Sequence, residues 1–431
     1  MPTRLDAKAA DFAPRFAAFL AAKREAAADV EAAVREIIAD VATRGDRALI
    51  ELSKRFDRSD LEKLGLRVEP AEITRAAKDC NQQALGALAF ARDRIEAYHR
   101  RQKPSDERFT DALGVELGHR WTAIDAVGLY VPGGNAAYPS SVLMNAVPAK
   151  IAGVARIVMA VPAPNGKINP LVLAAAELAG IDEIYRIGGA QAIAALAYGT
   201  QTIKPVAKVI GPGNAYVAAA KRLVFGRVGI DMIAGPSEVL ILADGEANPD
   251  WIAADLLAQA EHDEAAQPIL ITSSAKLAGA VEQAVNAQLV TLARKAIAAA
   301  SWNEFGAIIE VQAIEDALPL VDAIAPEHLE IMTAGAEALA ERIRNAGAIF
   351  IGAHTPEVIG DYVGGPNHVL PTARSARFSS GLGVLDFMKR TSILKCGADA
   401  LRALAPAAIT LAEAEGLDAH ARSVAIRLNR R

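Results

Sequence analysis

The chain has 431 residues, of which 52% are apolar and 23% charged, and its formal net charge at pH 7 is −5. These values exclude a disordered, collagenous or highly charged linker-type chain. The acidic balance gives no general attraction to phosphate backbones or anionic lipid, which argues against nucleic-acid and membrane partners. At roughly 150 residues per domain, the length predicts about three units. We therefore expect a soluble globular protein with more than one core.

Cysteine usage and the N-terminal segment indicate the compartment. Cys80 and Cys396 are the chain's two cysteines, too few for a disulfide framework, and they form no CxxC pair. Neither stands beside a histidine or a glycine-rich elbow, which argues against thiolate catalysis. In residues 1–16, charged residues interrupt every apolar stretch, so neither a signal peptide nor a spanning helix is expected. The sequence predicts a cytoplasmic protein.

The first elements in chain order are helical. From residue 27 to about residue 90, apolar side chains recur at spacings of three and four, as in Val34, Ile38 and Val41. This is the pattern of amphipathic helices.

The middle of the chain alternates between strands and helices. Short β-branched runs occur at 155–161, 183–187, 207–210 and 238–243, and alanine-rich helical stretches separate them at 170–179, 190–197 and 214–223. After a helix at about 250–260, strand-like runs return at 268–273, 306–311, 328–333 and 347–352. Alternation of this kind predicts two α/β units with parallel sheets and crossover helices.

The C-terminal tail, from about residue 381, is predicted to be helical, with no strand-like run long enough to join a sheet. It is too small to fold alone. We expect it to pack on something else, such as a second subunit.

Glycine-rich turns follow several of the predicted strands, at Tyr130–Gly134, Gly188–Gln191 and Gly211–Asn214. In a parallel sheet, all three would lie at the edge where α/β proteins bind ligands. Glycine permits close backbone approach, and each following helix offers free N–H groups to an anion. The glycines also suit plain tight turns, and no GxGxxG motif follows a strand. The residues alone do not choose NAD over another phosphorylated ligand.

Candidate metal and proton-transfer groups lie further along the chain. Gln259 and His262 are three residues apart near a helix end, so both side chains can reach one ion, although such pairs also arise by chance. Asp361 and His420 are possible additional ligands, and the set suits zinc or manganese. Glu327 and His328 precede a predicted strand, where an acid–base pair would be useful and where an ordinary surface pair is the alternative.

Read in order, seven stretches resemble the histidinol dehydrogenase family. They are 130–154, 210–222, 230–240, 258–263, 325–330, 360–372 and 415–420. Within them, PSSVLMNA and GPNHVLPT are long enough to be highly specific.

The resemblance implies a fold and a domain organisation. It implies an intertwined homodimer with two Rossmann-like α/β domains that lack the GxGxxG signature, plus small helical N-terminal and C-terminal elements. We expect an N-terminal helical element at 1–26, a discontinuous first α/β domain with the metal and catalytic residues, a second α/β domain with the NAD-binding turns, and a tail that crosses to the partner. The expected bounds are 27–129 with 241–382 for the first domain, 130–240 for the second and 383–431 for the tail.

The resemblance also implies a reaction and its residues. L-histidinol would be oxidised through L-histidinal to L-histidine with two NAD, His328 acting as base and Glu327 activating water. One zinc per site would position the substrate, held by Gln259, His262, Asp361 and the partner's His420. The NAD-contacting positions are Tyr130, Gln191 and Asn214. The substrate-contacting positions are Ser237, Gln259, His262, Glu327, His328, Asp361, His368, Glu415 and His420.

A paralogous zinc and NAD dehydrogenase of another polar alcohol, such as a sulfonated diol, is the alternative. Glu415 favours histidinol, because a carboxylate pairs with an ammonium group and repels a sulfonate.

Overall fold

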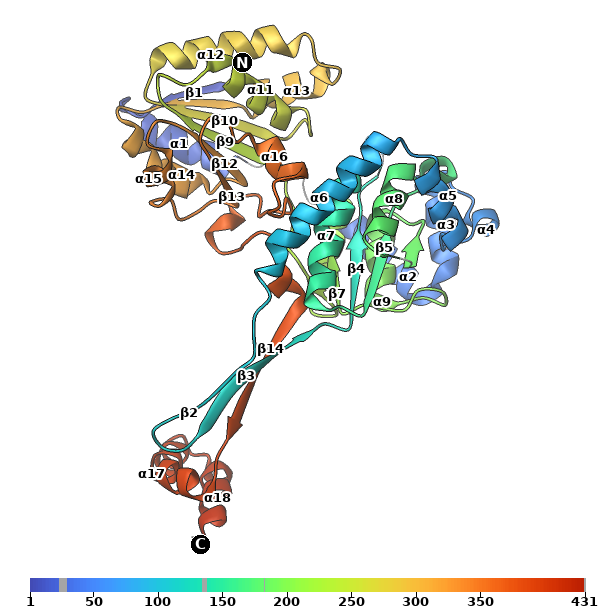
Figure 1. The fold of residues 1–431 in the computed structure, drawn as a ribbon, viewed down its shortest axis with the longest axis vertical. Coiled ribbons are helices and arrows are strands. Elements are labelled where there is room, and N and C mark those ends of the chain that lie inside the picture. The colour runs from blue at the N-terminus through green and yellow to red at the C-terminus, as the bar shows by residue number, and fades with distance from the viewer. Residues whose placement is uncertain (23–28, 134–137, 182, 430–431) are drawn as a thin grey trace.

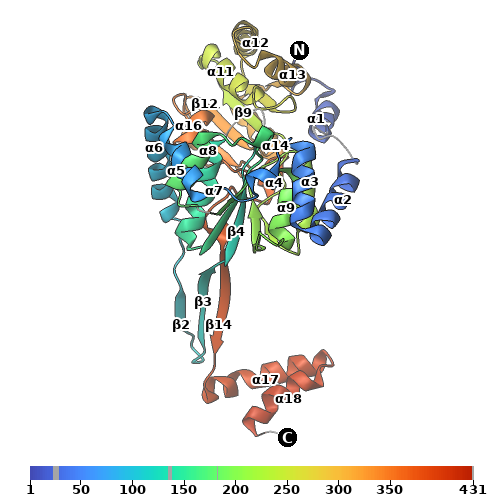
Figure 2. The same cartoon turned by 90° about the vertical axis from the view of Figure 1, so that its right-hand side faces the viewer.

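The computed structural model describes residues 1–22, 29–133, 138–181 and 183–429. Two α/β bodies lie side by side, and a long arm projects away from both (Figures 1 and 2). Each body is built on a parallel sheet, and the arm is a separate antiparallel sheet that ends in helices. The predicted mixed α/β class with parallel sheets is confirmed.

The first body is built on a five-stranded parallel sheet with the order β6-β5-β4-β7-β8. Its strands are β4 (Ala126–Tyr130), β5 (Arg156–Ala160), β6 (Glu183–Tyr185), β7 (Lys208–Ile210) and β8 (Gly229–Ile230). Its crossover helices are α7 (Pro139–Ala152), α8 (Pro170–Leu178), α9 (Gly189–Tyr198) and α10 (Ala215–Val224). The alternation of apolar runs thus produced the predicted elements, because strands buried on both faces are apolar throughout.

The N-terminal helices pack on this same body. They are α2 (Asp29–Arg44), α3 (Asp46–Phe56), α4 (Leu61–Leu64), α5 (Pro70–Lys78) and α6 (Gln82–Arg100). Val34 and Val41 of α2 are buried in one core with Val158 of β5, and Ile95 of α6 is buried in another with Leu129 of β4. The assignment of 27–129 to the same domain as 241–382 was therefore wrong. The apolar stripe of a helix indicates that the helix packs on a sheet. It does not indicate which of the two sheets that is.

The second body is built on a six-stranded parallel sheet with the order β1-β11-β10-β9-β12-β13. Its strands are β1 (Thr3–Asp6), β9 (Glu238–Ala243), β10 (Gln267–Thr272), β11 (Ala307–Glu310), β12 (His328–Met332) and β13 (Ala348–Ile351). Its helices are α1 (Phe12–Ala21), α11 (Pro249–Ala260), α12 (Ala275–Leu289), α13 (Lys295–Glu304), α14 (Leu318–Ile324), α15 (Ala336–Ala340) and α16 (Glu357–Tyr362).

Two expected boundaries of this body were wrong. Segment 1–26 is not purely helical, because β1 forms an edge strand of the six-stranded sheet. Only Leu5 of that short strand is buried, which explains why its pattern is weak. The boundary between 240 and 241 falls inside β9, since the five-stranded sheet already ends with β8.

The arm consists of β2 (Glu107–Thr110), β3 (Glu116–Ala123) and β14 (Met388–Lys395), all antiparallel. At its far end, α17 (Ala398–Ala414) and α18 (Asp418–Ala425) pack on each other (Figure 1). The tail at 383–431 is therefore not helical throughout. Most residues of β14 are polar and exposed, so no buried face marks it as a strand.

Short 3₁₀ helices complete the described elements, at Pro164–Gly166, Ile314–Ala317, Ser375–Arg377, Val384–Phe387 and Ile426–Leu428. Within the described ranges, no helix is both long enough and apolar enough to cross a membrane.

Candidate functional site

The candidate acid–base pair lies at the amino-terminal edge of the six-stranded sheet. His328 is the first residue of β12 and Glu327 precedes it, at the loop-to-strand edge that the sequence predicted. β9 is the neighbouring strand and begins at Glu238, so the backbone of Glu238 lies beside the pair. Ser237, a predicted substrate contact, directly precedes β9 and forms a hydrogen bond with Glu327.

His328 is buried and held by one backbone hydrogen bond. Its Nδ1 lies 2.9 Å from the carbonyl oxygen of Glu238. Its Nε2 is buried without a hydrogen-bond partner in the described structure, and it lies 3.7 Å from Oδ1 of Asp361. Burial lowers the pKa of the His328 imidazole to about 4, so the ring is neutral at pH 7. A neutral ring with an unengaged nitrogen is able to accept a proton.

Glu327 is buried beside His328, with its Oε2 3.8 Å from Nδ1 of His328. Its Oε2 accepts a hydrogen bond from the Glu238 N–H over 3.0 Å. Burial, followed by repulsion from the Glu238 carboxylate, raises the pKa of Glu327 well above its usual value. Burial therefore favours the neutral form of this carboxyl.

The candidate metal ligands of the six-stranded body meet beside this pair. Gln259 lies in the last turn of α11, and His262 follows the helix, with Gln259 Nε2 3.4 Å from His262 Nδ1. Gln259 is fully buried, yet its Oε1 has no hydrogen-bond partner among the described residues. Asp361 lies on α16, which packs on α11. An unpaired buried amide oxygen beside an imidazole and near a carboxylate fits a cation better than a closed core.

No group of three or more histidine, cysteine, aspartate or glutamate side chains within the described ranges forms a complete metal site. The predicted set contains an amide, Gln259, and a histidine of the tail, His420. Of the predicted ligands, His262 and Asp361 are the two residues of those types that belong to the six-stranded body.

The substrate-sized cavity lies between the two bodies. Its volume is about 320 Å³, and His328, Asp361 and His368 line it together with Arg94 of α6. The guanidinium of Arg94 donates to the carbonyl of Gly364 over 3.0 Å, which joins α6 to the segment after α16. Burial lowers the pKa of His368 to about 4. Most of the lining is apolar, and its polar groups include two neutral imidazoles, His328 and His368, and the Asp361 carboxyl.

The two most specific sequence motifs are in contact at this cavity. Asn367 donates to the carbonyl of Met144 over 2.6 Å, and Ser141 Oγ lies 3.4 Å from His368 Nε2. Ser141 and Met144 belong to PSSVLMNA, whereas Asn367 and His368 belong to GPNHVLPT. Ser141 and Asn367 were not among the predicted site residues. The sequence feature that points to them is their position in these two long motifs.

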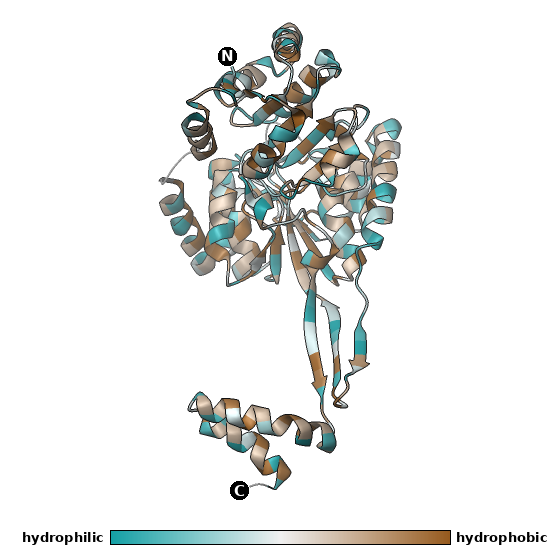
Figure 3. Cartoon of the chain, turned by 90° about the vertical axis from the view of Figure 1, so that its left-hand side faces the viewer, coloured by the Kyte–Doolittle hydropathy of each residue, from teal (hydrophilic) through white to brown (hydrophobic). Residues whose placement is uncertain are grey.

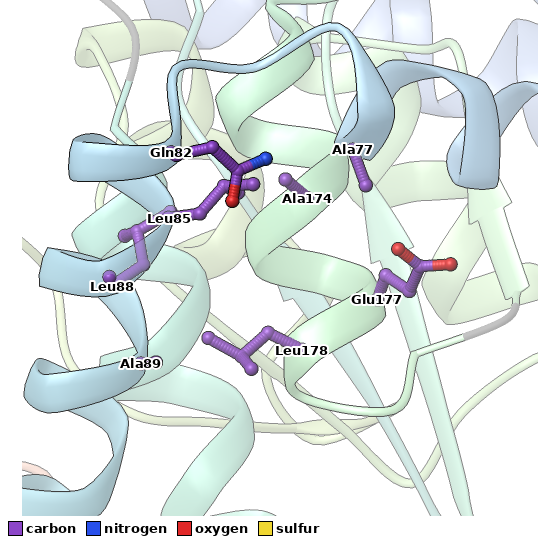
Figure 4. A pocket seen from close by; sticks show the side chains of 9 residues that line it. Ala77, Gln82, Leu85, Leu88, Ala89, Ala174, Glu177 and Leu178 are labelled. Atoms are coloured by element: carbon purple, nitrogen blue, oxygen red, sulfur yellow. The ribbon is translucent and has the colours of Figure 1, made fainter.

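A larger cavity, of about 490 Å³, lies between α5, α6 and α8 (Figure 4). Its lining is mostly aliphatic, and no predicted site residue contributes to it. Glu177, one of its polar groups, already accepts a hydrogen bond from Thr74 over 3.1 Å. We assign it no role in the chemistry.

The three glycine-rich turns lie at the carboxyl ends of β4, β6 and β7, on one edge of the five-stranded sheet. Tyr130 is buried, and its hydroxyl accepts a hydrogen bond from the Gly189 N–H over 3.1 Å, which links two of the turns. Gln191 is buried in the first turn of α9. Asn214 is the N-cap of α10 and accepts from the backbone N–H groups of residues 216 and 217. Gly134, which belongs to the first turn, lies outside the described residues.

Glu415 and His420 lie far from the cavity in this single chain. Glu415 ends α17 and His420 is on α18, and both are exposed. These helices stand at the end of the arm, away from both bodies (Figures 1 and 2). The structure thus brings the other predicted substrate and metal residues together and leaves these two apart.

Comparison with known proteins identifies the family. A family model for histidinol dehydrogenase matches residues 20–428. The chain belongs to the histidinol dehydrogenase family. It is 73% identical over 429 residues to a histidinol dehydrogenase of Bradyrhizobium diazoefficiens and 72% identical over 431 residues to one of Rhodopseudomonas palustris, with complete coverage of both chains in each case. A crystal structure of histidinol dehydrogenase from Elizabethkingia anophelis superposes with a TM-score of 0.95 at 36% identity, covering 99% of this chain and 98% of that one.

The matched range, 20–428, spans the positions of the predicted site residues. The cysteines remain poor candidates for chemistry. Both are unpaired, and burial together with Asp79 raises the pKa of the Cys80 thiol, which disfavours the thiolate.

Proposed function

We propose that this protein oxidises L-histidinol through L-histidinal to L-histidine, the last steps of histidine biosynthesis, with NAD as the hydride acceptor. Membership of the family, at 73% identity to a named histidinol dehydrogenase, supports the reaction. The observation that carries the mechanism is the unengaged Nε2 of His328, which lies 3.7 Å from Asp361 in a cavity of about 320 Å³.

Zinc is the proposed metal, with Gln259, His262 and Asp361 as its ligands from one chain. The unpaired Oε1 of Gln259 supports this assignment, because a buried amide oxygen without a donor is costly unless something binds it. Gln259, His262 and Asp361 would hold the ion, which when bound would supply a positively charged anchor that orients histidinol. The chain's own residues then carry out the proton transfers.

NAD is the proposed cofactor, bound along the turns at the carboxyl edge of the five-stranded sheet. At Gly188, a Cβ atom would lie 2.5 Å from the side chain of Pro162, and at Gly211 it would lie 2.1 Å from the carbonyl oxygen of Tyr130. These glycines keep the turns close to the sheet and their backbone available to a ligand. NAD bound there would supply the acceptor for the hydride that the substrate carbon releases in each oxidation.

In the first oxidation, His328 accepts the alcohol proton. The Glu238 carbonyl can only accept a hydrogen bond, so Nδ1 of the neutral ring carries the proton and Nε2 carries the lone pair. Loss of the hydroxyl proton to Nε2 allows the carbon to release a hydride and become the aldehyde carbon. The imidazolium that forms is next to the Asp361 carboxylate, which stabilises its charge.

In the second oxidation, Glu327 accepts a proton from water as the water oxygen bonds to the aldehyde carbon. His328 returns its proton to the former carbonyl oxygen, which gives the aldehyde hydrate. His328 then takes a hydroxyl proton again, the hydrate carbon releases the second hydride, and the carboxylic acid remains. Glu327 must be ionised to act in this way, although burial favours its neutral form.

We further propose that the active site is shared between two chains. The ribbon of the arm and the tail includes hydrophobic segments (Figure 3). In the single chain, Leu394, Leu411 and Ile426 are 67%, 64% and 59% exposed. Exposed apolar surface of this extent favours burial against another copy. A crossed tail would bring the partner's His420 to the metal and the partner's Glu415 to the amino group of histidinol.

The test is to mix the purified protein with L-histidinol and NAD, follow NADH, and identify the product. We expect two NADH per L-histidine formed, with activity lost to a strong chelator and restored by zinc. Turnover of another polar alcohol such as a sulfonated diol, with none of histidinol, would contradict the assignment.

A further inference from the structure

Lys221 and Asp231 form an ion pair in the interior of the five-stranded body. Their side chains are only 2% and 1% exposed. Neither residue lies in the cavity that contains His328, and neither takes part in the proposed proton transfers. Burying two opposite charges removes both from water, and attraction between them often fails to repay that cost. Stability alone therefore does not explain why this ion pair is present in the interior.

Both charges also bind the peptide groups of one residue, Gly211. Lys221 Nζ donates to the Gly211 carbonyl over 3.0 Å, and Asp231 Oδ2 accepts from the Gly211 N–H over 2.8 Å. Gly211 opens the third glycine-rich turn, between β7 and α10. The ion pair thus fixes both polar groups of the first residue of that turn.

The neighbours of Gly211 connect this arrangement to the proposed nucleotide site. Gly211 has a φ of +110°, and a Cβ atom there would lie 2.1 Å from the carbonyl oxygen of Tyr130. Three residues later, Asn214 caps α10, the same helix on which Lys221 lies two turns further along. The position of Gly211 therefore sets the spacing between two residues proposed to contact NAD, Tyr130 and Asn214.

The supports of Gly211 come from opposite sides. Lys221 reaches it from α10, and Asp231 reaches it from the residue after β8, the strand beside β7. An apolar pair of similar volume would fill the same space and would leave the N–H and the carbonyl of Gly211 without partners. Such a pair would preserve the packing of the interior, but the turn at Gly211 would no longer be held by hydrogen bonds to these two side chains.

We infer that Lys221 and Asp231 are positioning residues that hold the Gly211 turn in the conformation that binds NAD. The inference rests on the proposed function, because it takes NAD as the ligand of this edge. It assigns to the pair an effect on cofactor affinity and none on the proton transfers at His328 and Glu327.

Two paired variants of the full-length, zinc-loaded enzyme test this inference. Lys221→Met/Asp231→Asn removes both charges and keeps an acceptor for the Gly211 N–H. Lys221→Met/Asp231→Leu removes that acceptor as well. Because both partners are replaced together, no unpaired charge is left in the interior.

We expect the KM for NAD to rise about fivefold in the first variant and at least tenfold in the second, as one and then two hydrogen bonds are lost. The kcat and the KM for histidinol should stay within about twofold of the unmodified enzyme. Titration of NADH by its fluorescence should give the same order of affinities without turnover.

The matched control is the ion pair between Arg156 and Glu183, 2.7 Å apart at the opposite, amino-terminal edge of the same sheet. Arg156→Leu/Glu183→Leu should lower the melting temperature and leave the KM for NAD unchanged.

A KM for NAD within twofold of normal in a folded Lys221→Met/Asp231→Asn protein would overturn the inference. So would an equal rise in the Arg156 and Glu183 control. If the second variant fails to fold, the first still decides the question, since it retains the Gly211 N–H acceptor. Failure of the unmodified protein to bind NADH would instead overturn the proposed function, and this inference with it.

Discussion

The backbone of Glu238 joins the two residues of the proposed acid–base pair. Its N–H donates to Oε2 of Glu327 over 3.0 Å, and its carbonyl oxygen accepts from Nδ1 of His328 over 2.9 Å. One residue of β9 therefore fixes the orientation of both groups. Both bonds favour the charged form of their partner, since the N–H lowers the pKa of Glu327 and the carbonyl raises that of His328, against the larger effect of burial on each. The carbonyl also keeps the Nδ1 proton in place, so the lone pair of the neutral ring is on Nε2.

Replacement of His328 by asparagine should abolish proton removal from the alcohol. General-base catalysis contributes roughly 10²- to 10⁴-fold, so we expect kcat with histidinol to fall by about that factor. Zinc content and NADH affinity should be unchanged, because His328 is not a proposed ligand of either. His354→Asn is the control, since His354 is exposed and contacts Trp251. Equal kcat values for the two variants would contradict the role of His328.

Replacement of Glu327 by glutamine should slow the oxidation of histidinal more than that of histidinol. The amide can still accept from the Glu238 N–H but cannot take a proton from water. Comparing the pre-steady-state formation of the first NADH from histidinol with the rate of NADH formation from histidinal measures the difference. Similar losses for both substrates would argue that Glu327 supports the site without activating water.

The pH dependence of the histidinal reaction provides a separate test of Glu327. Burial raises its pKa, so its ionised fraction falls as pH falls through that raised value. We therefore expect kcat with histidinal in the unmodified enzyme to rise as pH rises through that raised value. Glu327→Gln should lose this rise. A parallel rise in both proteins would assign the titration to another group.

Much of this site could be predicted, because the sequence pattern shows where the buried strands begin and end. The apolar runs of β4, β7 and β12 end or begin at Tyr130, Ile210 and His328, so the turns and the acid–base pair were placed correctly. The partners of those residues were not visible. Glu238 acts through its backbone, and backbone contacts between strands leave no signature in side-chain pattern.

Domain membership and the arm were predicted less well for a different reason. The stripe on α2 shows a buried face, and only the folded structure shows that Val158 of the five-stranded sheet covers it. The strand β14 pairs with β3 along an exposed ribbon, so neither burial nor alternation marks it. The local sequence pattern therefore identified helices and strands with a buried face. It did not identify their distant packing partners or the exposed strand β14.

The crossed tail predicts complementation between inactive chains. A Glu327→Gln/His328→Asn protein retains the tail, and a His420→Ala protein retains the acid–base pair. Mixing them under conditions that allow subunit exchange should restore activity, since some sites then contain an intact set of residues. A quarter of the unmodified activity is roughly the expected ceiling, if exchange is random and sites are independent. Mixed dimers that form and remain inactive would contradict a shared site.

A buried pair of carboxyls predicts how stability depends on pH. Glu330 of β12 is hydrogen-bonded to Asp255 of α11, and its Oε1 accepts from the Glu357 N–H at the start of α16 over 2.6 Å. Burial, followed by the charge of Asp255, raises the pKa of Glu330 to about 9. Glu330 therefore retains its proton at pH 7 and donates it toward Asp255.

Because the pKa of Glu330 is higher in the folded state than in the unfolded chain, its contribution is complete below about pH 4.5 and is lost as pH rises toward 9. We expect the melting temperature to fall across that range, and Glu330→Gln, which mimics the protonated acid, to weaken the fall. Glu330→Leu should destabilise the fold by about 1–3 kcal/mol, since it leaves the half-buried Asp255 without its donor. Thermal unfolding of the three proteins at several pH values measures both effects. A Gln variant as unstable as the Leu variant would show that Glu330 is ionised in the fold and would contradict the shared proton.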